Sequence, residues 1–505
     1  MRDDPAASDD AAAPDHPVDG QPPGGEASSS SLRSRAALST YSTVVQGAAR
    51  LLFSVLVARL GSRELLGQTN SALSLAVLSN QLWSFPAATA GVRYVALRKT
   101  LGDDAGAAVV ARHIATRTAL VSLLIPTSAA LVGAFVLDFE PTLALGTLGL
   151  AWVYSIYVTV RGTQFGFLRF RHVAVWDTVA AATTIVLTVV VLLLDLTPLT
   201  LLPLIVGYGV FAVMSWPRRV RQRVDAGLRR EIDRFILFGA VAGVASGGLL
   251  QASQLAAQYF TGASGAGDFA AALSLATPAS MLSVALSTVL VPPLVAAAGR
   301  GDTAAVRRHG DAILRRLSTI FVGIFGVLIV VSPLGIAVIY GKELSAAAEL
   351  LPILLLAVMF TSIALGATTT LTSTRRRGPR AVALLNVTGL VVSCIAWALL
   401  GPDHGTTGVA VGYLVGSGVT SVGLVVTVWV VERQHWWGLT ARVLAGTALA
   451  VGLAVVTRGV PGLTGAVVQV LAAAVFALAW LVLCREDVRA LWATVRGREH
   501  PAGVG

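Results

Sequence analysis

The sequence predicts an all-α polytopic membrane protein of about 14 transmembrane helices, built as two parallel six-helix lobes followed by two C-terminal helices. Composition is the first reason. Hydrophobic residues make up 55% of the chain and charged residues 13%, whereas soluble domains average about 45–50% and about 25%. The second is that apolar runs long enough to span a bilayer alternate with arginine-rich connections. The third is an internal repeat.

The N-terminal segment 1–35 differs from the rest of the chain. Its acidic residues alternate with Ala, Pro and Gly: Asp3, Asp4, Asp9, Asp10, Asp15, Asp19 and Glu26. Such a segment has too little apolar surface to order itself. It also lacks the basic start and apolar core of a secretory signal. We therefore expect a disordered tail on the cytoplasmic side.

Fourteen apolar runs follow the tail, and each is long enough to cross a membrane, which takes about 20 mostly apolar residues. They lie near 37–60, 66–97, 113–137, 141–161, 174–195, 198–216, 235–258, 268–297, 313–340, 348–373, 381–400, 407–431, 441–457 and 464–484. The expected domains are an N-terminal lobe at 36–217, a linker at 218–234, a C-terminal lobe at 235–431, two additional helices at 432–484 and a cytoplasmic tail at 485–505.

The charges of the connections support this count. Arginine and lysine are retained on the cytoplasmic side of a membrane. Alternate connections carry nearly all of them, including Arg98, Lys99 and Arg112, then Arg161, Arg169 and Arg171, then the arginines of 218–234, and later Arg375, Arg376, Arg377 and Arg380. The connections between these are almost free of basic residues. An even number of spans with both termini in the cytoplasm follows.

The linker 218–234 holds seven arginines and four apolar residues at helical spacing, Val220, Val224, Leu228 and Ile232. This spacing predicts an amphipathic helix. We expect it to lie at the membrane interface with its arginines toward anionic lipid headgroups.

The internal repeat is clearest where GQTNSALSLA at 67–76 is answered by GDFAAALSLA at 267–276. Both copies fall on the second helix of a six-helix lobe and run in the same direction, so the lobes are related by an axis along the membrane normal. Gln68 and Asn70 of the first copy are Asp268 and Ala270 in the second. The N-terminal lobe is thus the more polar half.

Arg50 is the leading candidate for a functional residue because it lies midway along the first span. A cation at that depth costs about 2.5–3.5 kcal/mol, so it should face a wet cavity or a partner. Gln46 lies one turn earlier on the same face. A structural arginine bonded to a neighbouring helix, or one reaching the cytoplasmic interface, is the alternative.

Further candidates come from polar positions on other helices. Arg93 and Arg117 lie near span ends, where an arginine also serves as an interface anchor; the helix that Arg93 ends also carries Asn70 and Gln81. On the seventh span, Gln251, Gln254 and Gln258 share one face at intervals of three and four. Lining a cavity and hydrogen bonding between helices both account for them.

Several kinds of site are not expected. Asp177, Asp195 and Asp268 are placed at span ends, so the sequence offers no intramembrane relay of carboxylates. Cys394 and Cys484 lie far apart in apolar runs, which argues against a metal site or a disulfide. No catalytic motif or cofactor-binding loop is found, so an enzyme is not expected. The arginines lack interleaved aromatic residues, so nucleic acid is not expected as a partner.

Five stretches carry a resemblance to a known family: VLVARLGSRELLGQTNSALSLAVLSNQ at 55–81, FTGASGAGDFAAALSLATP at 260–278, VLVPPLVAAAGRGDTAAVRRH at 289–309, IYGKELSAAAELLPILLLA at 339–357 and the glycine-rich segment at 405–418. They resemble bacterial polysaccharide flippases of the multidrug, oligosaccharidyl-lipid and polysaccharide exporter superfamily. The resemblance covers most of 37–431. It departs at Gln254, where many relatives carry an acidic residue, so it does not imply cation coupling there.

The resemblance implies two six-helix lobes around a central cavity. It also implies transfer of an undecaprenyl-diphosphate-linked oligosaccharide from the inner to the outer leaflet of the bacterial cytoplasmic membrane by alternating access, for cell-surface polysaccharide biosynthesis. The expected partners are this lipid-linked oligosaccharide diphosphate, membrane lipids, and the glycan polymerase and glycosyltransferases of the same pathway. A multidrug exporter of the same superfamily, a membrane glycan polymerase or ligase, and a scaffold acting through 218–234 remain as alternatives.

Overall fold

The computed structural model describes residues 25–218, 220–341, 343–374, 378–433, 436–460 and 462–489. Within these ranges the chain is helical and contains no strand. Most of the expected tails, at 1–24 and 490–505, and the basic residues Arg375, Arg376 and Arg377 lie outside the described residues. The predicted fold class, an all-α polytopic membrane protein, is confirmed.

The first half of the chain consists of helices α1 to α9. Their bounds are α1 Gly25–Leu60, α2 Arg63–Gln81, α3 Ser84–Ala90, a π-helical turn Gly91–Val95, α4 Ala96–Thr100, α5 Asp104–Val121, α6 Ile125–Val136, α7 Pro141–Gly166, α8 Phe170–Leu193, a 3-10 turn Thr197–Leu199 and α9 Leu202–Met214. Because α1 begins at Gly25, the segment 25–35 is helical, and the expectation that it is disordered is wrong.

The second half consists of α10 Ala226–Gly299, α11 Thr303–Val330, α12 Ser332–Ile339, α13 Ala347–Thr374, α14 Gly378–Val431, α15 Trp437–Thr457 and α16 Gly462–Leu483. Two of these are pairs of helices joined at a tight kink, at Gly262 with φ 66° and at Gly405 with φ 54°. Only glycine adopts this backbone conformation without strain. Once α10 and α14 are divided there, each of the fourteen expected spans coincides with a helix or an interrupted helix.

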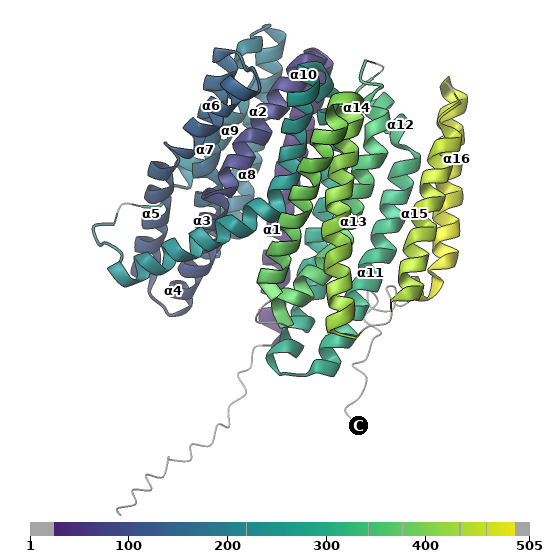
Figure 1. Ribbon diagram of the computed structural model, residues 1–505. Helices are drawn as coiled ribbons and strands as arrows, with labels where there is room; N and C mark the ends of the chain where they lie inside the picture. The colour runs from purple at the N-terminus through teal and green to yellow at the C-terminus, as the bar shows by residue number, and fades with distance from the viewer. Residues whose placement is uncertain are drawn as a thin grey trace, which may run out of the picture.

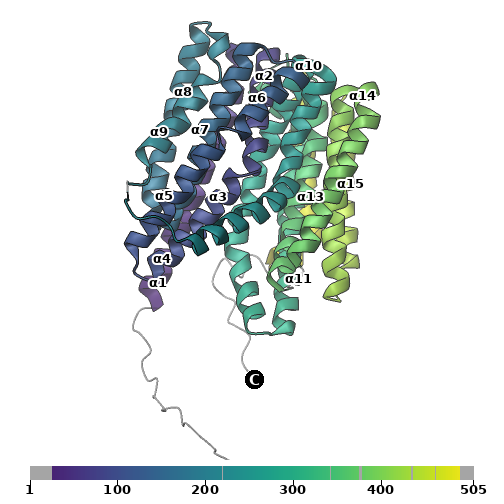
Figure 2. The ribbon, with the colours of Figure 1, turned by 60° about the vertical axis from the view of Figure 1, so that its left-hand side comes forward.

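The helices stand roughly side by side in two groups, with α1 to α9 in one and α11 to α16 in the other (Figure 1). The two views agree that α10 runs between them, and its closest neighbour in the first group is α2 (Figure 2). The last two helices, α15 and α16, pack on α11 at the edge of the second group.

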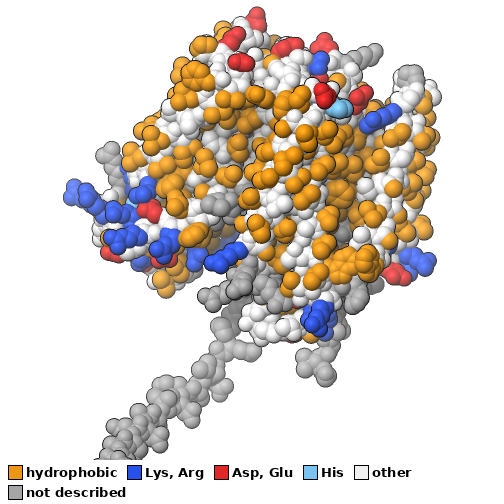
Figure 3. Space-filling model, in the orientation of Figure 1, with side chains coloured by type: hydrophobic (Ala, Val, Ile, Leu, Met, Phe, Trp, Pro, Cys, Tyr) orange, Lys and Arg blue, Asp and Glu red, His pale blue; other side chains and the backbone are white. Residues whose placement is uncertain are grey.

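Charged side chains separate toward the two ends of the molecule. Most of the Lys and Arg side chains in view lie at the lower end, most of the Asp and Glu side chains lie at the upper end, and a broad apolar band covers the surface between them (Figure 3). We call these the arginine-rich end and the arginine-poor end. The distribution agrees in direction with the orientation that the positive-inside rule predicts.

The second span is interrupted where it approaches the centre of the molecule. Helix α2 ends at Gln81, α3 contains Pro86, and the π-helical turn Gly91–Val95 follows. Proline removes a backbone donor and kinks a helix, and single π-turns inside helices are frequent at functional sites. Arg93 lies within this turn, so the interruption decides where its side chain points.

Among its described residues, the linker is helical only from Ala226 onward, so the predicted helix forms over its second half. Helix α10 begins only at Ala226, after Asp225, whose carboxylate accepts the Gly227 N–H at 2.8 Å. This hydrogen bond lowers the pKa of Asp225. Ile232 is fully buried in a cluster with side chains of α3, the π-turn and α5, and Val224 and Leu228 pack against it. The apolar face of this helix therefore packs on α3, the π-turn and α5, and the position of its arginines at the membrane interface stays a prediction.

The two copies of the repeat meet each other at the arginine-poor end. A Cβ on Gly67 would lie 1.9 Å from the Ala263 carbonyl oxygen, and a Cβ on Gly267 would lie 2.1 Å from the Arg63 carbonyl oxygen. Each glycine therefore faces the carbonyl four residues before the other. The local two-fold axis that relates the two copies therefore passes through this contact. Only glycine permits the two helices to approach so closely.

Two arginines join the halves beside this glycine contact. Arg63 forms an ion pair with Asp268 and donates from Nε to the Ser264 carbonyl oxygen at 3.1 Å. Arg59 donates to the carbonyl oxygens of Val338 and Ile339, the latter at 2.9 Å. The arginine-poor end is thus held closed by backbone and side-chain contacts between α1, α2, α10 and α12.

The glycine contact gives a prediction about stability. Gly67→Ala places a methyl group against a backbone carbonyl, and overpacking of this kind costs about 1–3 kcal/mol. We expect a lower apparent Tm in detergent for this variant. Gly335→Ala is the matched control, because that helical glycine has nothing within 4 Å of its added Cβ, and alanine improves helix propensity by about 1 kcal/mol. Equal Tm changes in the two variants would contradict the proposed close contact.

Candidate functional site

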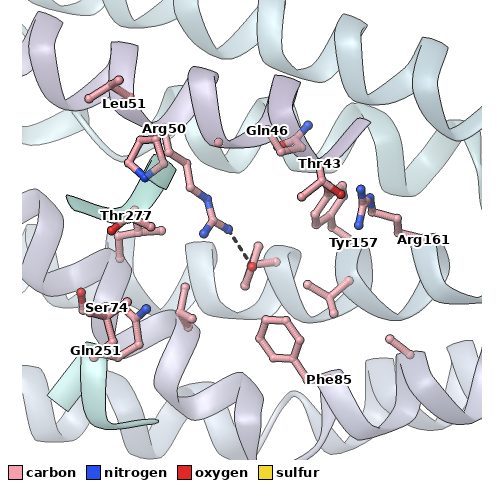
Figure 4. Close-up of a pocket in the computed structure, with 18 of the residues that line it drawn as sticks. Thr43, Gln46, Arg50, Leu51, Ser74, Phe85, Tyr157, Arg161, Gln251 and Thr277 are labelled. Carbon is pink, nitrogen blue, oxygen red and sulfur yellow. Dashed lines mark hydrogen bonds between the residues drawn. The ribbon is translucent and has the colours of Figure 1, made fainter. Parts of the chain in front are cut away.

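A cavity of about 610 Å³ lies between the two halves of the chain. Its walls come from α1, α2, α3, the π-turn and α7 on one side and from both segments of α10 on the other. The close-up shows side chains of α1, among them Gln46 and Arg50, opposite Ser74, Gln251 and Thr277 (Figure 4). A cavity that both lobes line changes shape whenever the lobes move relative to each other.

The charged side chains that line this cavity are all arginines, namely Arg50, Arg93 and Arg161. No Asp or Glu is among the lining residues that the structure describes. The other polar members are hydroxyl and amide groups, and the remainder are aliphatic or aromatic. The cavity is therefore cationic and partly apolar, with neutral hydrogen-bonding groups between its charges.

Arg50 points into the cavity from α1 and is held by two tyrosines. Its Nη2 donates to the hydroxyl oxygen of Tyr154 at 2.7 Å, and its Nε donates to that of Tyr208 at 3.0 Å. The guanidinium also lies 5.1 Å from the centre of the Tyr154 ring, within cation–π range. These partners are uncharged, so they fix the guanidinium without neutralising it.

Arg93 lines the same cavity from the π-turn, and its side chain is exposed. Its guanidinium lies 5.6 Å from the ring centre of Tyr94 and 5.2 Å from that of Phe235 on α10. It thus contacts both halves of the chain through aromatic faces. Like Arg50, it has no carboxylate partner among the described residues.

A buried carboxylate lies behind the cavity wall, and the sequence did not predict it. Asp177 was expected at a span end, but it lies within α8 and is 0% exposed. It accepts hydrogen bonds from Tyr157 Oη at 2.9 Å and from Gln46 Nε2 at 3.3 Å, and also from the Ser42 hydroxyl. The expectation that no carboxylate lies deep in a helix is therefore wrong.

Arg161 completes this buried network. It was expected in a cytoplasmic connection, but α7 extends to Gly166 and carries Arg161 on its cavity side. Its Nε forms an ion pair with Asp177 Oδ2 at 2.9 Å, and its Nη2 donates to Ser42 at 2.8 Å. Figure 4 shows it beside Tyr157. One of the three cavity arginines is thus neutralised within the protein, and two are not.

Three of the predicted amides line the cavity. They are Asn70 on α2 and Gln251 and Gln254 on α10. Gln254 Nε2 donates to the Ser71 hydroxyl at 3.2 Å and to the Ala266 carbonyl at 3.1 Å, and Asn70 accepts from Ser54 at 3.2 Å. Both alternatives left open by their spacing therefore apply to Gln254, which lines the cavity and bonds between helices.

Three predicted site residues lie outside the lining. Gln258 accepts a hydrogen bond from Ser71 at 3.2 Å within the contact between α2 and α10. Gln81 packs against α10, where its Nε2 would lie 2.6 Å from a Cβ placed on Gly247. Arg117 forms an ion pair with Asp233 at 3.0 Å and lies over the Trp83 ring. The contacts of all three are between helices.

Reasoning from the sequence missed Tyr154, Tyr208, Arg161 and Asp177. A signal for the last two was present, because Arg161 and Asp177 fall within a few residues of span boundaries that are uncertain by a turn. The tyrosines gave no signal, since an aromatic residue in an apolar run resembles any other packing residue. No group of three or more His, Cys, Asp or Glu that could hold a metal ion occurs in the described part of the chain.

The chain matches no protein-family model and no curated protein sequence. Among solved structures it is similar to the lipid II flippase MurJ in an inward closed conformation, with a TM-score of 0.66 and 14% identity over 88% of this chain and 98% of that one. It is also similar to an inward-facing multidrug resistance MATE family transporter of the MOP superfamily, with a TM-score of 0.62 and 13% identity over 81% and 98%.

A third similar structure is a MOP superfamily transporter from Pyrococcus furiosus, whose binding pocket is described as having reverse polarity. Its TM-score is 0.56 at 13% identity, covering 80% of this chain and 96% of that one. At these identities the likenesses establish the fold alone, which this chain shares with these three proteins.

The buried pair predicts a large stability effect. Asp177→Ala leaves the Arg161 guanidinium without its carboxylate, and removing one partner of a buried pair costs about 3–5 kcal/mol. We expect a lower Tm for this variant and recovery in Asp177→Leu with Arg161→Leu. Glu140→Ala is the control, because Glu140 is exposed and its side chain makes no cap hydrogen bond. A Tm for Asp177→Ala equal to that of the control would refute the pair as a stabilising contact.

Proposed function

We propose that this protein is a flippase that moves an undecaprenyl-diphosphate-linked oligosaccharide from the inner to the outer leaflet of the bacterial cytoplasmic membrane. The observation that carries the proposal is the charge of the cavity, whose ionic lining residues are three arginines with no carboxylate among them. A diphosphate group complements this charge, because arginine binds oxyanions through paired N–H donors and stays protonated in a nonpolar environment.

The rest of the cavity suits the other parts of such a substrate. Thr43, Gln46, Ser74 and Gln251 offer neutral donors and acceptors for sugar hydroxyls. The lipid chain would remain in the bilayer and run along the last two helices, α15 and α16. Transfer would use alternating access, in which the lobes rock about the cavity and the contacts of Arg59 and Arg63 at the arginine-poor end open.

The membrane potential can drive this transfer. Moving one negative charge outward across an inside-negative membrane gains about 2.3 kcal/mol per 100 mV. A diphosphate carries that charge through the field together with its glycan. Export would therefore not need a relay of protons through the protein.

A multidrug exporter is the competing function within the same fold, which a multidrug resistance transporter shares. Cationic drugs call for acidic groups in the cavity. The described lining offers arginines instead, and Asp177, the carboxylate behind its wall, is already paired with Arg161. Drug susceptibility of a deletion strain separates the two functions, since only the exporter predicts increased sensitivity.

Replacing Arg50 tests the proposal. Arg50→Ala removes one of the two cavity arginines that have no carboxylate partner among the described residues, and we expect cell-surface glycan export to fall at least tenfold in cells while the protein still reaches the membrane. Arg117→Ala is the control, because Arg117 lies outside the cavity lining and is paired with Asp233. Normal glycan export by the Arg50 variant at wild-type protein levels would overturn the proposed function.

A further inference from the structure

The way in which Arg50 is held leaves a defined part of its guanidinium available. Nε and Nη2 form one edge of the group, and each gives a hydrogen to a tyrosine oxygen, Tyr208 at 3.0 Å and Tyr154 at 2.7 Å. Nη1 has no hydrogen-bond partner among the described residues and is not a buried atom. The end of the guanidinium, formed by Nη1 and the second hydrogen of Nη2, therefore faces the cavity (Figure 4).

The two tyrosine hydroxyls have unused donors. A guanidinium is only a donor, so the oxygens of Tyr154 and Tyr208 act as acceptors toward it and each keeps its own hydrogen. Neither hydroxyl hydrogen has an acceptor within the described ranges of the chain. The neighbouring Tyr157 differs, because it donates to Asp177 at 2.9 Å. Of these two residues, Tyr154 belongs to the cavity lining and Tyr208 does not.

Packing fixes these hydroxyls in place. Tyr154 and Tyr208 are 4% and 3% exposed. Their ring centres are 5.0 Å apart, and the Tyr157 ring lies 5.8 Å from the first and 4.7 Å from the second. Rings in a cluster of this kind do not turn away to satisfy a lost hydrogen bond, so their geometry is set before any ligand enters.

We propose that Tyr154 is a specificity-determining residue, whose hydroxyl joins the free end of Arg50 in a cradle of N–H and O–H donors for a phosphoryl group. Tyr208 is a positioning residue that fixes the guanidinium edge. The inference rests on the proposed function, namely that the cavity binds an anionic headgroup, and adds which atoms recognise it. A phosphate ester or diphosphate has several oxyanions in a tetrahedral array, and this matches donors that approach from two directions.

The second arginine network of the cavity explains why tyrosines are suited to this task. Arg161 is held by a carboxylate, Asp177, which neutralises its charge within the protein. Arg50 is held by two neutral oxygens, which fix it equally well and leave its charge for a ligand. The phosphoryl group is therefore assigned to Arg50 and Tyr154, and the Arg161 network supports the wall behind them.

Binding of a simple lipid diphosphate to the full-length protein in nanodiscs tests the inference. The probe is farnesyl diphosphate, measured by calorimetry, and farnesol is the matched neutral lipid. Tyr154→Phe removes one hydroxyl and keeps the ring. We expect it to weaken farnesyl diphosphate binding about tenfold, the usual effect of a lost hydrogen bond to a charged group, and to leave farnesol binding unchanged. Tyr208→Phe should weaken it by about threefold.

Tyr413→Phe serves as the control, because Tyr413 is equally buried in α14 but does not line the cavity. Its affinity for farnesyl diphosphate should equal that of the wild type. If Arg50→Ala loses binding while Tyr154→Phe keeps it, the role of Tyr154 is refuted and the proposed function stands. If Arg50→Ala also keeps wild-type affinity, or the wild type does not prefer the diphosphate to farnesol, both are refuted.

Discussion

The cost of holding an unneutralised guanidinium inside a membrane protein is the constraint on which the site depends. A cation that has left bulk water must find oxygen acceptors or return to it. Arg161 meets this requirement with Asp177, while Arg50 meets it with the hydroxyls of Tyr154 and Tyr208. The pair of Arg161 with Asp177 has no net charge, whereas Arg50 keeps its positive charge beside the two neutral hydroxyls. The aromatic cluster, the position of α1 and the cavity wall follow from that difference.

The duplication supplies the framework that lets such a cavity open and close. Gly67 and Gly267 hold equivalent places in the two copies and face each other across the arginine-poor end. The helices approach closely there, Arg63 joins them through its ion pair with Asp268, and Arg59 joins α1 to α12 beside them. A junction of two smooth helix surfaces near a symmetry axis can separate without disrupting either lobe. The repeat thus contributes to the mechanism as well as to the origin of the fold.

Composition and charge periodicity predicted the fold class, because both follow from the bilayer and not from details of packing. Arg50 was predictable for the same reason, since a cation at mid-span is costly wherever its partners lie. Asp177 and Arg161 were assigned to span ends, because hydropathy cannot place a boundary to within one turn. The helical spacing of the linker's apolar residues, Ile232 among them, is the same whether they face lipid or pack against α3, the π-turn and α5. The spacing alone therefore could not say which of these they meet. Tertiary neighbours decide both cases.

The central claim is that the cavity carries a diphosphate-linked headgroup across the membrane. Its most direct test is transfer between leaflets of a fluorescent polyprenyl-diphosphate-linked sugar in liposomes containing the purified protein, with the corresponding neutral glycolipid as comparison. We expect the diphosphate lipid to cross faster than in protein-free vesicles, and an imposed potential, negative on the side of departure, to accelerate its transfer. Equal transfer of the neutral glycolipid, or no acceleration over protein-free vesicles, would contradict it.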